Sequence, residues 1–215
     1  MARIRNGIFG PIHGKLGNLV GATWKSVPYL RVLPDLTKNS KLATQAQIAS
    51  REKFKFMQEW LVPFYSYVTV GFKNHAKDKT EINAAFSINY KLAIVGVYPD
   101  LSIDYSKVVL SKGYLPGLFN AEAQFSANTE ELELTWLQNY NDDSSLDDLL
   151  ILTVYNRELK IVDGFIGGVR RADLKCSLKL NPKLMGRSLD VYVSLISLNG
   201  KKVANSEYLG RVVAI

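Results

Sequence analysis

The sequence predicts an α+β, β-rich fold in three parts: an extended, glycine-rich N-terminal arm, one or two helices, and a C-terminal antiparallel β-sandwich of the immunoglobulin or fibronectin kind. Glycines recur through the first 40 residues, apolar residues show helical spacing around residues 43–61, and short alternating apolar runs begin near residue 120. With 215 residues, 47% of them hydrophobic, the chain can bury a core. We expect two domains, residues 1–119 and residues 120–215.

Residues 1–40 are expected to form the extended arm. Glycines interrupt every possible helix there, and the apolar side chains between them are too irregularly spaced to build a core alone. Pro28 and Pro34 favour extended backbone and remove ladder hydrogen bonds, which edge strands and connecting segments tolerate. We expect the glycines to allow close approach of the backbone to a partner surface. They are Gly7, Gly10, Gly14, Gly17 and Gly21.

A first helix is predicted over residues 43–61. Ser40 or Thr44 can cap its N-terminus, helix-forming residues fill it, and Pro63 supplies a stop. Its apolar residues recur at near-helical spacing, so we expect one face to pack in the core. Residues 65–72 then alternate enough to form a strand or to lead into one.

A second helix is predicted to open at Thr80 and to be ended by Gly96 and Pro99. Several apolar residues after Thr80 fall on one helical face. Residues 101–110 follow as a strand, and a change of alternation near Ser106 predicts a β-bulge there.

The C-terminal region has a pattern of strands only. Roughly 95 residues carry about seven short strands, the number found in immunoglobulin-like sandwiches. Polar turns separate them, and Asn199-Gly200 is the strongest hairpin signal. Trp136 and Cys176 fall at inward positions of alternating strands. Residues 149–155 are predicted to form a buried strand. The other alternating positions are Leu132, Leu134, Leu174, Leu178, Leu180, Leu189, Val191, Val193 and Leu195.

Positive charge is concentrated in the first part of the chain. Residues 1–80 contain 13 Lys and Arg against 4 Asp and Glu, whereas residues 81–215 contain 14 against 16. The asymmetry indicates a negatively charged partner, which could be another copy of the chain, nucleic acid or a membrane surface, although a solubilising surface explains it equally. The residues expected to bind the partner are Arg3, Arg5, Gly14, Lys15, Gly17, Trp24, Lys25 and Arg31. Arg51, Lys53 and Lys55 extend the basic pattern into the first helix.

The sequence offers no catalytic or cofactor motif. His13 and His75 are the only histidines, so no metal-binding histidine cluster can be written. Gly10 and the residues after it are one short of a phosphate-binding loop. We therefore expect a protein that is not an enzyme, with no cofactor. The acidic segment from Asp142 to Asp148 leaves calcium binding open.

The N-terminus lacks the continuous apolar segment of a secretory signal peptide. No apolar stretch approaches the roughly 20 residues needed to cross a bilayer. The single cysteine, Cys176, permits no internal disulfide, which fits a reducing compartment. We expect a cytoplasmic protein at synthesis, without a membrane span, and leave later export or incorporation into a particle open.

Several short motifs together resemble an uncharacterised, domain-of-unknown-function family of Gram-negative bacteria. They include the run Gly14-Lys15-Leu16-Gly17-Asn18-Leu19-Val20-Gly21, the pairs Trp24-Lys25 and Tyr98-Pro99, and Ser206-Glu207-Tyr208 near the end. The resemblance covers nearly the whole chain and implies no activity, cofactor or catalytic residue. The C-terminal part is also similar to fibronectin type III repeats in size and strand rhythm.

These observations favour a structural or assembly protein that forms a homo-oligomer through its basic arm, as a component of a filament, sheath or phage-like particle. Two alternatives remain open. The basic first third could bind nucleic acid. The sandwich could bind a carbohydrate or peptide, an expectation that rests on fold analogy.

Overall fold

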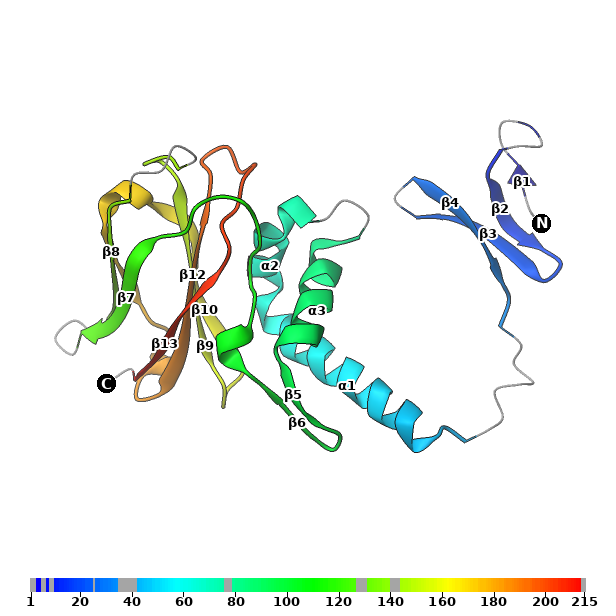
Figure 1. Ribbon diagram of the computed structural model, residues 1–215, viewed down its shortest axis with the longest axis horizontal. Helices are drawn as coiled ribbons and strands as arrows, with labels where there is room; N and C mark the ends of the chain where they lie inside the picture. The colour runs from blue at the N-terminus through cyan, green and yellow to red at the C-terminus, as the bar shows by residue number, and fades with distance from the viewer. Residues whose placement is uncertain are drawn as a thin grey trace. The chain divides into compact units, whose positions relative to one another are not determined.

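The computed structural model describes residues 3–4, 7, 10–24, 26–34, 42–75, 79–126, 131–139 and 144–213 (Figure 1). Contacts divide the chain into two compact units, Met1–Gln47 and Ile48–Ile215. The boundary predicted between residues 119 and 120 lies within the second of these units. No helix among the described residues is long and apolar enough to span a membrane.

The N-terminal unit contains an antiparallel sheet, here called the N-terminal sheet. The backbone is extended, as predicted, and the structure pairs it into regular strands. The residues Gly17 and Asn18 form the two-residue turn between two of them, and Gly17 has a φ of 56°, which glycine adopts without strain. The strands lie in the order β1-β2-β3-β4, with β1 Arg3–Ile4, β2 Ile12–Leu16, β3 Leu19–Trp24 and β4 Val27–Val32.

Helix α1 spans Gln45–Leu61 and confirms the first predicted helix. Thr44 caps it: the Gln47 backbone N–H donates to Thr44 Oγ1 over 3.3 Å, and the Thr44 N–H donates to Gln47 Oε1 over 3.1 Å. After Leu61 the chain turns through the short 3₁₀ helix η2, Val62–Phe64, which contains Pro63.

The strand predicted for residues 65–72 is wrong, because Tyr65–Gly71 forms helix α2. Phe64, Val68 and Phe72 lie four residues apart and are all fully buried. That spacing puts all three on one helical face. Burial of this face in the core outweighs the β preference of the segment's aromatic and β-branched residues.

Helix α3 spans Glu81–Leu92, and Thr80 Oγ1 accepts a hydrogen bond from the Asn83 backbone N–H. It ends at Leu92, so Gly96 does not terminate it but lies in strand β5, Ile94–Val97, which pairs with β6, Asp100–Ile103. The bulge predicted near Ser106 is also wrong. The chain leaves β6 and forms the 3₁₀ helix η4, Tyr105–Lys107, because the carboxylate of Asp104 accepts the Ser106 N–H. The short 3₁₀ helix η3 covers Lys73–His75.

Seven strands form a β-sandwich, as predicted. One sheet has the order β11-β8-β7 and the other β10-β9-β12-β13. All neighbouring strands in them are antiparallel. The strands are β7 Phe119–Ser126, β8 Glu131–Leu137, β9 Leu149–Asn156, β10 Ile161–Arg170, β11 Lys175–Lys179, β12 Ser188–Ile196 and β13 Glu207–Val213; 3₁₀ helices η5 Arg171–Asp173 and η6 Pro182–Leu184 lie between them.

Strand β9 is buried on both faces, which joins the sandwich to the helices. Leu150, Leu152 and Val154 belong to the core between the two sheets. Tyr155 instead belongs, with Tyr192 of β12, to a second core that includes apolar residues of α2 and α3. The helices accordingly lie beside the four-stranded sheet (Figure 1). Residues of α2, α3, β9 and β12 therefore share one core.

Candidate functional site

The N-terminal sheet has two chemically different faces. Residues opposite one another in neighbouring strands share a face. Leu16, Leu19 and Val32 are opposite one another across β2, β3 and β4, and Leu30 lies opposite Gly21 on the same side. We call these four large side chains the apolar face. Leu16 is 56% exposed, Leu19 39%, Leu30 54% and Val32 68%.

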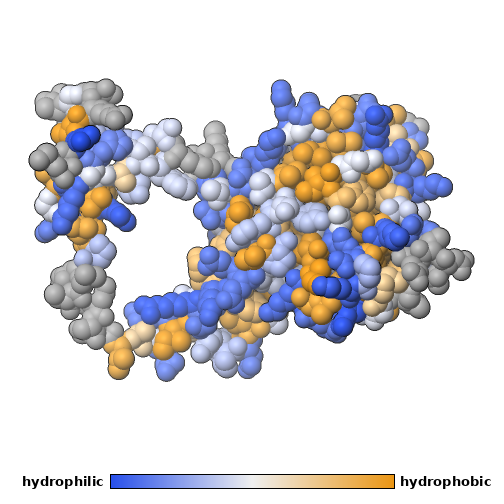
Figure 2. Space-filling model, turned by 180° about the vertical axis from the view of Figure 1, so that it is seen from behind, coloured by the Kyte–Doolittle hydropathy of each residue, from blue (hydrophilic) through white to orange (hydrophobic). Residues whose placement is uncertain are grey.

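The other side of the sheet carries basic and aromatic residues. Lys15, Val20 and Arg31 are opposite one another across the same three strands. By alternation along β3 and β4, Trp24 and Tyr29 lie on this side too. We call Lys15, Trp24, Tyr29 and Arg31 the basic-aromatic face. Hydrophobic and hydrophilic side chains are interspersed on the surface of this unit, at the left of Figure 2.

The N-terminal sheet has almost no buried interior. Gly21 is the one buried residue of β1 to β4, and all six residues of β4 are exposed. A Cβ added at Gly21 would collide with the backbone oxygen of Ile12. The sequence predicts that the glycines allow close approach of the backbone to a partner surface. At Gly21 the backbone that lies close is that of Ile12 in the same chain. A sheet of this kind normally buries one face against another layer.

The outer edge of β4 offers backbone groups for further pairing. The Leu33 N–H donates to the Asn18 carbonyl over 2.8 Å, which fixes the alternation of hydrogen bonds between β3 and β4. The backbone groups of Pro28, Leu30 and Val32 therefore point away from β3. Proline lacks an N–H, so Pro28 sits where it breaks no bond to β3. Leu30 and Val32 each present one N–H and one C=O.

The structure brings together part of the predicted partner-binding set. Lys15, Trp24 and Arg31 share the basic-aromatic face, while Arg3 lies in the edge strand β1 opposite His13. Gly14 and Gly17 shape the backbone, with φ values of 100° and 56°. Arg5 and Lys25 lie outside the described residues. Leu30 and Val32 were not predicted as site residues, because their place on the sheet depends on the pairing of β4 with β3.

Two basic residues of α1, Lys53 and Lys55, have partners in their own unit. Lys53 Nζ lies 5.0 Å from the centre of the Tyr90 ring, and Lys55 Nζ lies 3.9 Å from Glu59 Oε1. These surface contacts contribute little stability.

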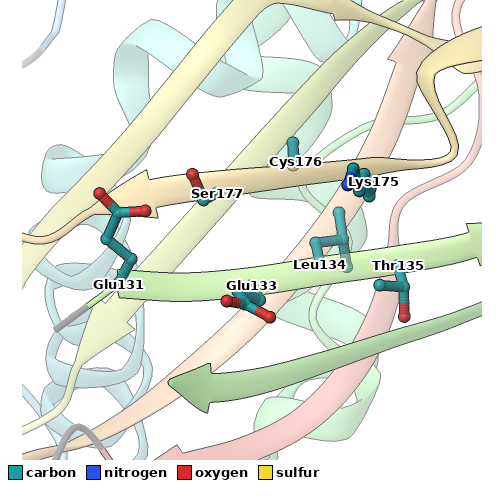
Figure 3. A pocket seen from close by; sticks show the side chains of 7 residues that line it. All are labelled: Glu131, Glu133, Leu134, Thr135, Lys175, Cys176 and Ser177. Carbon is teal, nitrogen blue, oxygen red and sulfur yellow. The ribbon is translucent and has the colours of Figure 1, made fainter. Parts of the chain in front are cut away.

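The sandwich carries a groove of about 400 Å³ along β8 and β11. Figure 3 shows Glu131 and Glu133 on one strand and Lys175 on the other, with Cys176 between Lys175 and Ser177. Burial raises the pKa of the Cys176 thiol to about 11, and Asp173 adds to the shift. A thiol with that pKa is a poor nucleophile at neutral pH.

Two aspartates of the acidic segment considered for calcium binding form ion pairs with arginines. Asp148 is buried and its Oδ2 lies 3.1 Å from Arg171 Nη2, while Asp147 pairs with Arg170 over 3.1 Å. Asp142 and Asp143 lie outside the described residues. Within the described part of the chain, no group of three or more His, Cys, Asp or Glu residues is placed to hold a metal ion.

The family comparison covers nearly the whole chain. A family model described as "Family of unknown function (DUF6266)" matches residues 11–210. The match includes β2 to β4, strands β7 to β12 and the first part of β13. No curated protein matches the sequence.

Proposed function

The chain belongs to DUF6266, a family of unknown function, and we propose that it is a non-enzymatic assembly protein that self-associates through its N-terminal sheet. The observation that carries the proposal is the exposure of every residue of β4, the last strand in the sheet order of the described residues, next to the apolar face. Exposed apolar surface beside unpaired strand edges is typical of surfaces that bind another chain.

The composition of β4 favours pairing over protection of the edge. Sheet edges that avoid pairing are short or carry charges and proline. β4 carries one charge, Arg31, and one proline, Pro28, but four of its six residues are large and apolar. These are Val27, Tyr29, Leu30 and Val32, between 45% and 68% exposed. Pro28 has no backbone N–H to donate at the outer edge of β4, whereas Leu30 and Val32 each have one.

A second copy of the chain is the partner that fits this surface. An interface between identical subunits about a two-fold axis uses the same patch twice. A strand edge meets that condition, because antiparallel pairing of a strand with itself is symmetric. The N-terminal unit would thereby gain pairing partners for β4 and bury part of the apolar face.

Light scattering coupled to gel filtration of the full-length chain tests the proposal. We expect wild type to be dimeric or larger, and the double variant Leu30→Lys with Val32→Lys to be monomeric, because it places like charges at the interface. Leu198→Lys is the matched control, since Leu198 is 61% exposed in the other unit. A wild-type monomer at every concentration, or an oligomer that survives the double variant, would overturn the proposal.

A second candidate function, nucleic-acid binding, is favoured by the basic-aromatic face. Lys15 and Arg31 lie in one row across the strands, with Tyr29 and Trp24 on the same side. Basic residues that track phosphates beside aromatic rings that stack on bases are typical of single-strand binding. Fluorescence anisotropy with a single-stranded oligonucleotide should show affinity that falls with salt, with a slope reduced by about 0.7 for each phosphate contact removed. No binding at low salt would eliminate this candidate.

The strand order supports a fibronectin-like description of the sandwich. In constant-type immunoglobulin domains the fourth strand pairs within the sheet of the first two. Here the fourth strand, β10, pairs with the third, β9, in the opposite sheet. We retain carbohydrate or peptide binding by the sandwich as a third possibility, supported by fold analogy alone.

A further inference from the structure

From the free edge of β4 we infer a specific pairing: two copies join their β4 strands antiparallel about a two-fold axis at Leu30, forming one continuous eight-stranded sheet. This inference rests on the proposed self-association and adds the register. Three structural facts select it: which backbone groups point outward, where proline lies, and where the only charge of β4 lies.

The outward backbone groups restrict the possible registers. Hydrogen bonds across the new edge must come from Pro28, Leu30 and Val32, because the groups of Val27, Tyr29 and Arg31 are directed toward β3. An axis at Leu30 pairs Leu30 with its symmetry mate and Val32 with Pro28 of the second copy. That arrangement makes four hydrogen bonds: two between the leucines, and one from each Val32 N–H to a Pro28 carbonyl. The missing N–H of proline leaves only the Val32 carbonyl unpaired.

Moving the axis by one residue gives a worse arrangement in either direction. An axis at Tyr29 pairs Leu30 with Pro28 of the second copy and makes only two hydrogen bonds. An axis at Arg31 also makes four, by pairing Leu30 with Val32, but it sets the two Arg31 side chains directly opposite one another. Like charges at that position destabilise a sheet.

With the axis at Leu30, the charged side chain of Arg31 makes a favourable contact with the second copy. It places each Arg31 opposite Tyr29 of the second copy, at a non-hydrogen-bonded position where side chains are closest. A guanidinium near a tyrosine ring is a favourable pair. Arg31 and Tyr29 both lie on the basic-aromatic face and are exposed, so both side chains are free to make this contact.

This pairing leaves a surface for larger assemblies. A two-fold axis perpendicular to the sheet puts both apolar faces on the same side. Leu16, Leu19, Leu30 and Val32 of each copy then form one patch twice the size. A two-fold contact alone closes a dimer, whereas a filament, sheath or particle needs a second contact. The doubled apolar face supplies it.

Single cysteines test the register, because only a residue on the two-fold axis lies opposite itself. In a Cys176→Ala background, Leu30→Cys should form an intermolecular disulfide under mild oxidation, since opposed Cα atoms of a hydrogen-bonded pair lie about 5.5 Å apart. Arg31→Cys should not. Thr23→Cys, on the neighbouring strand β3 and also exposed, controls for random collision. Crosslinking of Arg31→Cys in preference to Leu30→Cys would overturn the inference.

A charge variant gives an independent readout. Tyr29→Glu should tighten the dimer by roughly 2- to 10-fold in sedimentation experiments, because it places a carboxylate opposite Arg31 of the second copy. Unchanged or weaker dimerisation would contradict the register. A wild-type dimer that fails both tests refutes this register alone, whereas a wild-type monomer refutes the proposed function as well.

Discussion

The guanidinium of Arg157 and the carboxylate of Asp190 form a two-point ion pair. Nε donates to Oδ2 and Nη2 donates to Oδ1, both over 2.6 Å. Asp190 is fully buried, and the Tyr208 hydroxyl donates a third hydrogen bond to Oδ1 over 2.7 Å. Arg157 also lies over the Tyr105 ring, 3.8 Å from its centre. The hydrogen bonds to Asp190 raise the pKa of Arg157, which is charged at every accessible pH.

Replacing Arg157 should destabilise the second unit strongly. In Arg157→Met the Asp190 carboxylate stays buried without its cation, and loss of one partner of a buried pair costs about 3–5 kcal/mol. Urea denaturation followed by circular dichroism measures the loss. Arg170→Met is the matched control, because its pair with Asp147 is more than half exposed on both sides and contributes less than about 1 kcal/mol. Equal losses would show that burial of Asp190 is unimportant.

Arg171 should not tolerate lysine, although the charge is kept. Its side chain is 1% exposed and donates to the carbonyls of Pro116 and Gly117, to Asn139 and to Asp148. Lysine has three donors in a different geometry, so carbonyl groups are left unpaired at about 1–3 kcal/mol each. We expect Arg171→Lys to lower the free energy of unfolding by roughly 2–5 kcal/mol.

The control for Arg171→Lys is Arg187→Lys. Arg187 pairs with Glu158 over 2.6 Å at the surface, where a change of cation costs within about 0.5 kcal/mol. If Arg171→Lys were as mild as this control, the buried hydrogen bonds of Arg171 would not be holding the loops of the sandwich.

Stability should fall in alkaline solution because of two partly buried tyrosines, Tyr67 and Tyr208. Burial, with a hydrogen bond to Asp190, raises the pKa of Tyr208 to about 12, and burial next to Asp163 raises the pKa of Tyr67 to about 12. Unfolded tyrosine ionises near pH 10, so the unfolded state releases protons first. The stability contribution is complete below about pH 10 and is lost as the pH rises toward about 12.

Denaturation series between pH 9 and pH 12 measure this slope. Tyr208→Phe and Tyr67→Phe should each make it shallower, because phenylalanine does not ionise. A slope identical to wild type in both variants would mean that neither tyrosine contributes to the alkaline loss.

Two nearby glycines should respond differently to alanine. A Cβ at Gly113 would collide with the backbone carbonyl of Val203, whereas a Cβ at Gly117 meets nothing within 4 Å. Gly113→Ala must displace a backbone contact, which costs about 1–3 kcal/mol or more. Gly117→Ala should be within about 0.5 kcal/mol of wild type. Thermal denaturation of both variants checks the difference, and a neutral Gly113→Ala would contradict it.

The elements that the sequence predicted correctly have local signals. Thr44 and Gln47 form the cap at the start of α1, and Thr80 caps α3. Alternating residues of β8 and β12 face the sandwich core as predicted. The predictions failed where a distant contact decides the outcome. Residues 65–71 are helical, and Val68 packs in the second core with residues of α3 and β9 that lie far away in the chain.

The sequence predicted some of the residues of the candidate site but not how the strands arrange them. Lys15, Trp24 and Arg31 were expected to act together, and pairing of β2, β3 and β4 puts them on one face. The backbone N–H and C=O groups of Leu30 and Val32 point away from β3 because other residues of β4 make the hydrogen bonds to β3. Register is set by the turn and by the partner strand, so the sequence of β4 alone does not contain it.

By itself the sequence determined the β-rich class, the first helix, the sandwich strands and the basic character of the N-terminal region, because periodicity, capping and charge are properties of neighbouring residues. Only the tertiary structure decided that β9 is buried on both faces, that Asp190 is buried against Arg157, and that β4 is the last strand of the N-terminal sheet. Each of these depends on residues far apart in the chain, whose contacts form only when the strands pair and the layers pack.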